Sequence, residues 1–492
     1  MSLINVTNLT FSYDGSYDNI FENVNFQIDT DWKLGFTGRN GRGKTTFLNL
    51  LLGKYEYSGT ISANVTFEYF PYEVSNPELF TIDLIKEISP NSVDWEILRE
   101  LSLLNVDNDV LYRQYSTLSK GEQTKALLAA LFLKENSFLL IDEPTNHLDA
   151  EAREKLSNYF RKKHGFILVS HDRTFLDNCV DHILAINKTN IEIQKGNFSS
   201  WWRNKELQDG FELAENEKLK KDISRLVSSA KNTSTWSDSV EGSKFGSTNS
   251  GSKLDKGYVG HKAAKLMKRA KNIERRQHNM LEEKAKLLKN IESKESLEIV
   301  PLKFHATRFV ELTDLSISYG ERVVCEGVNF TIEQGDRIAL HGKNGSGKSS
   351  LLKLICGENI AYSGTLIKKN QLIISYVSQD TSGLRGSLSD YTVTQGIDET
   401  LFKSILRKLD FSREQFDKNL EDFSGGQRKK VLIARSLCQQ AHLYIWDEPL
   451  NFIDVVSRIQ IEELLLEYQI TILFVEHDSS FCKNIATKSV TL

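Results

Sequence analysis

Two glycine-rich segments combine residue types that bind phosphate. Residues 38–46 (GRNGRGKTT) and 342–350 (GKNGSGKSS) both fit GxxxxGK[ST], and each follows a strand-like run and precedes a helical pattern. Glycines let successive backbone N–H groups wrap phosphates, a helix N-terminus adds its positive dipole, and the lysine reaches the terminal phosphates. One match could be an ordinary glycine turn, but two matches at equivalent positions of the two halves of the chain favour phosphate binding. The predicted contacts are Gly38, Arg39, Asn40, Gly41, Arg42, Gly43, Lys44, Thr45, Thr46, Gly342, Lys343, Asn344, Gly345, Ser346, Gly347, Lys348, Ser349 and Ser350.

Carboxylates follow a later apolar run in both halves of the chain. Asp142 and Asp447 end these runs, and Glu143 and Glu448 come directly after them. We predict that the aspartates hold Mg²⁺ with the hydroxyl that follows each phosphate-binding lysine, and that the glutamates orient or deprotonate the attacking water. Two surface acids at a strand end are the plainer alternative. The Mg²⁺ ligands predicted from these patterns are Thr45, Asp142, Ser349 and Asp447.

Two histidines stand at matched distances beyond the glutamates. His171 lies 28 residues after Glu143, and His477 lies 29 residues after Glu448. Each ends an apolar run and is followed by aspartate. A lone histidine would more often be structural, but the matched spacing favours a pair of γ-phosphate sensors. We therefore count both histidines among the catalytic candidates.

An internal duplication must position these residues. The interval from Lys44 to Glu143 is 99 residues, and that from Lys348 to Glu448 is 100. In each copy, short apolar runs such as FLLID (138–142) and LYIWDE (443–448) alternate with helical patterns. Such runs are typical of buried parallel strands, so each copy is predicted to be an α/β domain that carries the phosphate segment at a strand end.

Length and composition limit the class of protein. At 492 residues the chain is too long for one core, and its 40% hydrophobic and 26% charged residues are ordinary globular values. It has five cysteines and no CxxC pair, so neither a disulfide framework nor a zinc site is indicated. No signal peptide and no long apolar span is visible in the sequence. We expect a soluble, cytoplasmic protein with reduced thiols.

The region between the copies has a different composition. It is rich in Lys, Glu, Ser and Asn, and apolar residues at helical spacing predict two antiparallel helices joined by a tip loop at about 233–261. Residues 251–290 contain twelve Lys or Arg against four acids, a local charge of +8, although the whole chain carries −4. This excess suits contact with a phosphate backbone, and the plainer alternative is a solvated helical face. Aromatic residues in the loop could stack on bases, with Trp236 and Phe245 as the tip candidates.

At LSKGEQ (118–123) and FSGGQR (423–428) the sequence resembles the ATP-binding cassette family. The resemblance implies an α/β fold with two P-loop ATP-binding cassette domains in tandem, joined by a long helical-hairpin linker, and it implies ATP hydrolysis with ATP and Mg²⁺ as cofactors. The expected domains are a first cassette (1–205), a basic helical-hairpin linker (206–302) and a second cassette (303–492). In that family one cassette contacts the γ-phosphate held by the other, so this chain would be a monomer that pairs its own cassettes. The contact residues thus implied are Ser119, Gly121, Ser424, Gly425 and Gly426.

The resemblance also implies residues for the base and for a glutamine loop. Tyr13 and Tyr319 match the aromatic that stacks on adenine, although a strand tyrosine is often only packing. Gln379 matches the glutamine that contacts ATP and Mg²⁺ in the second copy, whereas the first copy has Tyr72 there. Lys120 replaces the first glycine of the signature in the first copy. The two sites are therefore expected to hydrolyse ATP at different rates.

Further motifs are similar to those of the F subfamily, whose tandem cassettes act on ribosomes. These are DEPTNHLD (142–149), SHDRTFLD (170–177) and GNFSSWW (196–202). In that subfamily the linker enters the exit-tRNA (E) site and its tip approaches the P-site tRNA and the peptidyl-transferase centre. The second copy reads DEPLNFID (447–454), a variant that looks like the antibiotic-resistance branch, closest to the Lsa-like group. That group implies resistance to lincosamides, streptogramin A and pleuromutilins.

The leading hypothesis is therefore an ATPase that binds the bacterial 70S ribosome and displaces drug through its linker. It implies contacts with 23S rRNA and P-site tRNA, and no membrane subunit. One alternative is a housekeeping translation factor of the same subfamily that relieves stalled ribosomes. Another is the motor of a transporter, against which the long basic linker argues.

Overall fold

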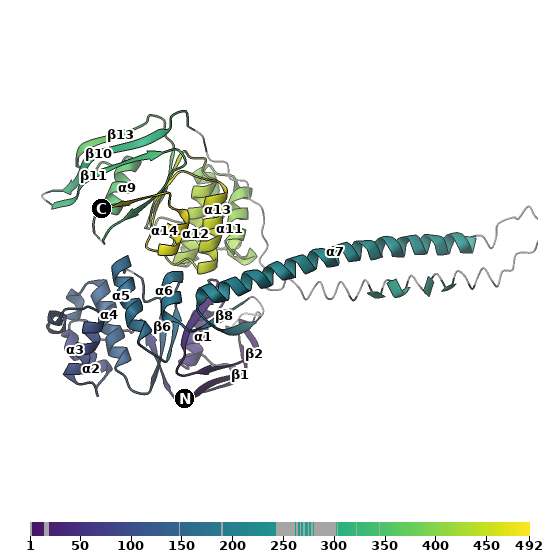
Figure 1. Ribbon diagram of the computed structural model, residues 1–492, viewed down its shortest axis with the longest axis horizontal. Coiled ribbons are helices and arrows are strands. Elements are labelled where there is room, and N and C mark those ends of the chain that lie inside the picture. The colour runs from purple at the N-terminus through teal and green to yellow at the C-terminus, as the bar shows by residue number, and fades with distance from the viewer. Residues whose placement is uncertain are drawn as a thin grey trace, which may run out of the picture. The chain divides into compact units, whose positions relative to one another are not determined.

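The structure is a computed structural model that describes residues 2–13, 19–146, 148–187, 190–242, 302, 304–320, 322–343 and 345–492, with part of 261–279. The chain forms two compact units (Figure 1). One unit contains both copies of the repeat, Met1–Trp201 and Lys294–Leu492, and the other is Trp202–Ser293. Among the described residues, no helix is long and apolar enough to cross a bilayer.

The first repeat consists of a small antiparallel sheet, a larger sheet and covering helices. The small sheet has the strand order β2-β1-β4, and the larger one has the order β5-β6-β7-β3-β8-β9, parallel except at β9. The strands are β1 (Leu3–Phe11), β2 (Phe21–Asp29), β3 (Lys33–Gly38), β4 (Ser58–Ser62), β5 (Thr66–Phe70), β6 (Ser137–Asp142), β7 (Phe166–Val169), β8 (His182–Ile186) and β9 (Ile191–Lys195). The helices are α1 (Lys44–Leu51), α2 (Thr81–Ile88), α3 (Asp94–Leu103), α4 (Lys120–Phe132), α5 (Ala150–Arg161) and α6 (Arg173–Cys179), with 3-10 turns η1 (Asn108–Tyr112) and η2 (Tyr115–Thr117).

The second repeat has the same plan. Its antiparallel sheet has the order β11-β10-β13, and its parallel sheet has the order β14-β15-β16-β12-β17. The strands are β10 (Arg308–Tyr319), β11 (Arg322–Glu333), β12 (Arg337–His341), β13 (Tyr362–Lys368), β14 (Ile374–Val377), β15 (Leu443–Asp447), β16 (Ile472–Val475) and β17 (Lys488–Thr491). The helices are α9 (Lys348–Cys356), α10 (Leu388–Gln395), α11 (Glu399–Lys408), α12 (Gly425–Cys438), α13 (Val455–Glu467) and α14 (Ser479–Ile485), with 3-10 turns η4 (Arg413–Asp417) and η5 (Leu420–Asp422).

Apolar strands bury both faces of each parallel sheet. The side chains of β7 and β16 are buried throughout, because helices or the antiparallel sheet cover each face. One core of the second repeat holds α9 between its two sheets, as Figure 1 shows, and another packs α10–α14 on the opposite face. The predicted α/β fold with two tandem domains is thus confirmed.

Strand order places the predicted site residues together. In the first repeat β7 lies between β3 and β6, and in the second β16 lies between β12 and β15. The phosphate segments follow β3 and β12, the carboxylates end β6 and β15, and the histidines follow β7 and β16. Because parallel strands end at one edge of a sheet, all three groups meet at the carboxyl edge.

The linker begins with one long helix. Helix α7 runs from Phe198 to Gly242, so the predicted loop start at 233 is wrong: residues 233–242 are helical. The reason is that no proline or glycine interrupts the chain between Phe211 and Glu241, and serine and threonine alone do not end a helix. The described residues between 261 and 279 are helical, as predicted. Trp236 lies in α7, whereas Phe245 and the rest of the tip lie outside the described residues.

Candidate functional site

The two phosphate segments form matching turns between a strand and a helix. Gly43 and Gly347 precede α1 and α9 with φ of 92° and 89°, and Gly41 and Gly345 also have positive φ. A Cβ at Gly43 would lie 2.6 Å from Cγ2 of Ile20, so both backbone conformation and space require glycine there. Because of these turns, the N-termini of α1 and α9 face the space that each phosphate segment encloses, where a bound phosphate would meet the backbone N–H groups. Asn344 lies outside the described residues.

Each phosphate-segment lysine is held by its own loop. Lys44 Nζ donates to the carbonyl oxygens of Gly38 at 2.7 Å and Arg39 at 3.1 Å, and Lys348 Nζ donates to those of Gly342 and Lys343, both at 2.8 Å. Burial lowers the pKa of both lysines below the ordinary value, with nearby acids opposing the shift. Among the residues that the structure describes, neither ammonium group has an acidic partner in hydrogen-bond range, so both lie inside the loops, placed to receive a phosphate.

The two candidate adenine-stacking tyrosines are anchored in the same way. The hydroxyl groups of Tyr13 and Thr46 lie 2.8 Å apart, and Tyr319 donates to Ser350 Oγ at 3.1 Å. Both tyrosines keep exposed rings. Each hydroxyl is fixed on the helix that follows the phosphate segment. The ring of Tyr13 also meets the rings of Phe11 and Tyr55 edge to face. This geometry supports the stacking role, which stays a prediction.

The aspartates lie next to the predicted hydroxyl ligands. Thr45 Oγ1 donates to Asp142 Oδ2 at 3.3 Å, and Tyr69 donates to the same oxygen at 3.2 Å. Burial raises the pKa of Asp142 and of Asp447, and a hydrogen bond from Ser349 partly opposes this at Asp447. Among the described residues, Oδ1 of Asp447 is buried without a hydrogen-bond partner. A buried carboxylate oxygen beside a hydroxyl fits a divalent oxygen-binding cation such as Mg²⁺.

The catalytic candidates pair in the same geometry in both repeats. His171 Nε2 lies 3.5 Å from Glu143 Oε1, and His477 Nε2 lies 3.5 Å from Glu448 Oε1. Both glutamates adopt the left-handed region, with φ of 50° and 46°, which costs about 1–3 kcal/mol for a non-glycine residue. Such strain is tolerated where neighbouring structure fixes the backbone. The left-handed backbone accompanies a side chain that points toward the histidine in both repeats.

The two glutamates differ in their other partners. Gln379 Nε2 and Asn451 Nδ2 each donate to Glu448 Oε2 at 2.7 Å. Burial alone would raise the pKa of Glu448, but these bonds and His477 lower it below the ordinary value. At Glu143 burial and the charge of Asp142 raise the pKa to about 8. Near neutral pH the surroundings thus favour the ionised carboxylate more strongly at Glu448 than at Glu143.

Residues of the second repeat contact the phosphate segment of the first. Asn40 Nδ2 donates to the carbonyl oxygen of Phe452 at 2.8 Å, and a Cβ added at Gly426 would lie 3.0 Å from that Asn40 nitrogen. Arg39 and Arg42, both predicted phosphate contacts, lie 3.8 and 3.6 Å from Asp410. The structure thus brings Asn40 of the first phosphate segment close to Gly426 of the second signature, and their shared contact with ATP stays a prediction.

The second phosphate segment opens onto two cavities. One of about 340 Å³ is lined by Lys348, Gln379 and Glu448 together with Leu148 and Arg153 of the first repeat. The other, of about 220 Å³, lies beside the same lysine. Ser119 and Gly121, predicted partners of this site, line neither cavity. The predicted signature contacts of the second site therefore lie outside the walls of these two cavities.

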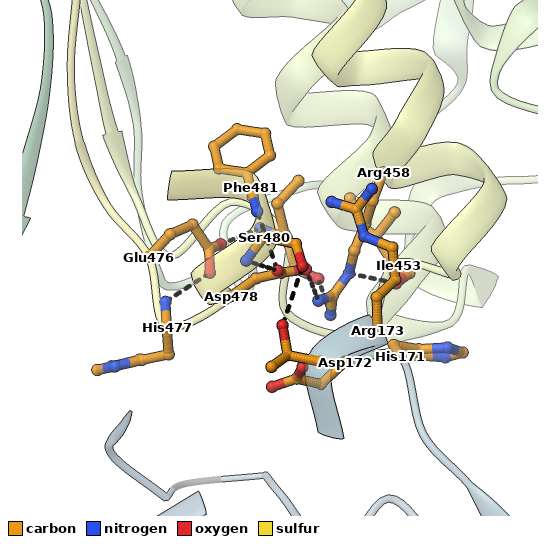
Figure 2. A network of polar contacts seen from close by, with 12 residues as sticks. His171, Asp172, Arg173, Ile453, Arg458, Glu476, His477, Asp478, Ser480 and Phe481 are labelled. Atoms are coloured by element: carbon orange, nitrogen blue, oxygen red, sulfur yellow. Dashed lines mark hydrogen bonds and ion pairs between the residues drawn. The ribbon is translucent and has the colours of Figure 1, made fainter. Parts of the chain in front are cut away.

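A buried network joins the segments that follow the histidines (Figure 2). Arg458 of α13 donates to Asp478 at 3.0 Å and to the carbonyl oxygen of Ile453 at 2.9 Å. Between the repeats, Arg173 pairs with Glu462, and the hydroxyls of Thr174 and Ser480 lie 2.9 Å apart. The segments that carry the two histidines are thus bonded to each other.

Comparison with known families agrees with this geometry. A family model described as "ABC transporter" matches residues 21–146 and 325–451, which contain both phosphate segments and both carboxylate pairs. The chain belongs to the ATP-binding cassette family. It is accordingly an ATP-binding protein and an ATPase with two cassettes, 1–205 and 303–492 in the division proposed from the sequence.

Several relatives extend over nearly the whole chain. Ribosome protection protein VmlR of Bacillus subtilis is 27% identical, covering 100% of this chain and 86% of its own length. Erythromycin resistance ATP-binding protein MsrA of Staphylococcus epidermidis is 29% identical over 93% and 91%, and ATP-binding protein Uup of Haemophilus influenzae is 28% identical over 99% and 78%. The tandem cassettes and these relatives identify an ABC-F protein. An archaeal ribosome recycling factor, aABCE1, shares the fold, with a TM-score of 0.62 and 18% identity over 98% of this chain and 87% of that one.

Some residues of the two sites belong to none of the motifs from which the sites were predicted. Tyr69, Asn451 and Asp410 contact predicted site residues from positions outside the phosphate and signature motifs. Asn451 stands inside DEPLNFID, three residues after Glu448, and this closeness in sequence is the one signal that could have indicated its contact with Glu448. Asp410 is near the site only through the pairing of cassettes, which no local pattern reveals.

Single-site variants are expected to differ in activity. Glu448→Gln should lower total ATP turnover more than Glu143→Gln, because three side chains hold Glu448 ionised whereas burial favours the protonated form of Glu143. Steady-state phosphate release near neutral pH measures this. Equal losses in the two variants, or a larger loss from Glu143→Gln, would contradict the inferred asymmetry.

Proposed function

We propose that this chain is a ribosome-protection ATPase that binds the bacterial 70S ribosome in its ATP-closed state. The observation that carries the proposal is the contact of the second cassette with the phosphate segment of the first, through Asn40 and Phe452, within a chain related end to end to VmlR. ATP binding and cassette closure are then one event, and ribosome affinity follows closure as a population shift. The site of action would be the cytoplasm.

A short path connects the first ATP site to the linker. His171 is followed by α6, and Asp177 near the end of α6 accepts from the backbone N–H of Ser199 at 2.7 Å, at the start of α7. Phe198 and Trp201 are buried beside this contact. A movement of His171 on closure or hydrolysis would therefore reach the first turn of α7. We propose this as the route by which ATP state controls the linker.

In the proposed cycle the lysines bind the β- and γ-phosphates, and the tyrosines hold the adenine. Mg²⁺, when bound between Asp142 and Thr45 or between Asp447 and Ser349, would neutralise phosphate charge. Glu448 accepts a proton from the attacking water while His477 keeps its carboxylate in place. Loss of the γ-phosphate removes one link between the cassettes and weakens the closed state, so hydrolysis resets it.

The finer assignment follows from the linker. We propose that the basic linker enters the ribosomal E site, contacts 23S rRNA and P-site tRNA, and displaces drug from the peptidyl-transferase centre. The variant DEPLNFID supports an Lsa-like spectrum of lincosamides, streptogramin A and pleuromutilins. VmlR and MsrA, named for ribosome protection and erythromycin resistance, support resistance in general. Trp236 and Phe245 remain the proposed tip residues.

Ribosome co-sedimentation tests the proposal. The Glu143→Gln/Glu448→Gln variant should pellet with 70S ribosomes when ATP is present and stay in the supernatant without it. Lys44→Ala/Lys348→Ala is the matched control, since it cannot grip the phosphates and should not pellet in either condition. Failure of the glutamine variant to pellet with ATP would refute ribosome binding in the closed state.

Removing the tip should separate resistance from hydrolysis. Deletion of residues 236–256 is expected to abolish resistance while ATP turnover stays within about twofold, because the described contacts of both ATP sites come from residues of the two cassettes. Inhibitory concentrations and phosphate release from the same variant give the two readouts. Resistance that survives the deletion would remove the linker tip from the mechanism.

A housekeeping factor is the second candidate, favoured by the Uup relatives that match 99% of this chain. Deleting the gene would then alter growth or ribosome stalling without changing drug sensitivity. A transporter motor would instead change drug accumulation in cells on expression.

A further inference from the structure

A buried glutamate immediately precedes His477 in the second cassette. Glu476 is 5% exposed, and its Oε1 accepts from the backbone N–H of Leu450 at 2.7 Å. Its Oε2 accepts from the backbone N–H of His477 at 2.9 Å (Figure 2). Leu450 lies in the turn that follows Glu448. One carboxylate thus bonds both loops that carry the glutamate–histidine pair.

A buried lysine completes the same network. Lys429 of α12 is 2% exposed, and its Nζ donates to the carbonyl oxygens of Ser378 at 3.0 Å and Glu448 at 3.2 Å. Ser378 directly precedes Gln379, which bonds the Glu448 side chain. Burial lowers the pKa of Lys429, and the charge of Glu476 opposes this shift only in part. Burial likewise raises the pKa of Glu476, with Arg458 as its main opposing charge. The Glu448 backbone is therefore fixed from one side and the His477 backbone from the other.

The first cassette has neither charged group. The positions of Lys429, Leu450 and Glu476 are taken by Thr124, Thr145 and Ser170. There the residues at the positions of Leu450 and Glu476 meet through their hydroxyl groups, Thr145 Oγ1 to Ser170 Oγ at 3.5 Å, the outer limit of a hydrogen bond. The glutamate–histidine distance is nevertheless 3.5 Å in both cassettes. The two cassettes thus reach the same glutamate–histidine distance with different residues at these three positions.

We propose that Glu476 and Lys429 are positioning residues of the second ATP site, which hold Glu448 and His477 in register for hydrolysis. Neither is a catalytic residue, because each acts through backbone groups of the loops it joins. Lys429 also stands five residues after Ser424, in the helix whose N-terminus belongs to the first site. The network therefore connects α12 to the catalytic turn of the second site.

The test measures ATP hydrolysis at the second site alone, without ribosomes, in a full chain that carries Glu143→Gln. The variants are Glu476→Ser, Glu476→Gln, and a triple exchange, Lys429→Thr, Leu450→Thr and Glu476→Ser, which installs the first-cassette set. Glu100→Gln is the control, because Glu100 is equally buried but bonds Tyr159 and Lys163 in the first cassette. Thermal unfolding identifies any variant that fails to fold.

We expect Glu476→Ser to lower kcat about tenfold or more with KM for ATP within about twofold, because misplaced reacting groups slow chemistry more than binding. Glu476→Gln should show a smaller loss of kcat than Glu476→Ser. The triple exchange should recover most of the kcat that Glu476→Ser loses. Unchanged kcat in folded Glu476→Ser, a rise in KM alone, an equal loss in Glu100→Gln, or no recovery in the triple exchange would each overturn the proposal. Because no ribosome is present, failure here is distinct from failure of ribosome protection.

Discussion

Replacing both Glu143 and Glu448 with glutamine is expected to lower ATP turnover about 100-fold or more while ATP still binds, because positioned proton acceptors contribute on this scale. Glutamine keeps the size and hydrogen-bonding reach of the side chain but cannot take a proton from water. The lysines, tyrosines and phosphate turns are unchanged, so the cassettes should still close. Phosphate release and equilibrium binding of a fluorescent ATP analogue measure the two quantities.

A matched control separates charge loss at the site from charge loss elsewhere. Glu467→Gln removes an exposed carboxylate at the end of α13 and should leave turnover unchanged. If the double variant hydrolyses ATP at the rate of this control, neither glutamate is the catalytic base. If it loses ATP binding as well, the two side chains serve mainly to shape the pocket.

The largest expected loss of stability comes from Asp454→Ala. Asp454 is fully buried, accepts from Lys430 Nζ at 2.9 Å and caps α13 through the backbone N–H of Ser457 at 2.9 Å. Removing it leaves Lys430 buried without its partner, which costs about 3–5 kcal/mol. The matched control is Asp149→Ala, which removes the equivalent cap of α5, bonded to the backbone N–H of Ala152. Asp149 forms no ion pair with any residue that the structure describes, so the loss should be about 1 kcal/mol. Urea unfolding of both variants gives the comparison.

Asp454 also predicts a pH dependence. Burial alone would raise its pKa, but Lys430, Arg39 and Lys44 hold the pKa of Asp454 well below its ordinary range. A carboxyl group whose folded-state pKa is lowered contributes stability above its unfolded pKa, and this contribution is lost as pH falls. The stability difference between the natural chain and Asp454→Ala should therefore be constant near neutral pH and shrink below about pH 4. A difference that grows on acidification would contradict this assignment.

The local parts of the sites could be predicted from the sequence because local backbone geometry sets them. The spacing GxxxxGK places positive-φ glycines at 41, 43, 345 and 347, and those turns need no distant residue. Apolar runs predicted the parallel strands, and the strand ends then placed Asp142 and Asp447. By contrast, the left-handed backbone of Glu143 and Glu448 could not be predicted, because glutamate has no preference for it and the surrounding fold imposes it.

Contacts between distant segments account for what the sequence did not reveal. Arg39 and Arg42 were predicted as phosphate contacts from their place in the segment, yet both lie beside Asp410 of the other cassette. Glu476 was overlooked because a glutamate before His477 has no motif of its own, and only its two backbone bonds show its place. Helix α7 extends beyond the predicted loop start at 233 because serine and threonine, although common in loops, do not by themselves end a helix.

Drug susceptibility of a bacterium that expresses this chain tests the ribosome-protection role most directly. The natural chain should raise the inhibitory concentration of a lincosamide or a pleuromutilin, and the Glu143→Gln/Glu448→Gln variant, expressed at the same level, should not. Unchanged susceptibility with the natural chain, while it hydrolyses ATP and binds ribosomes in the same cells, would contradict ribosome protection and favour the housekeeping role.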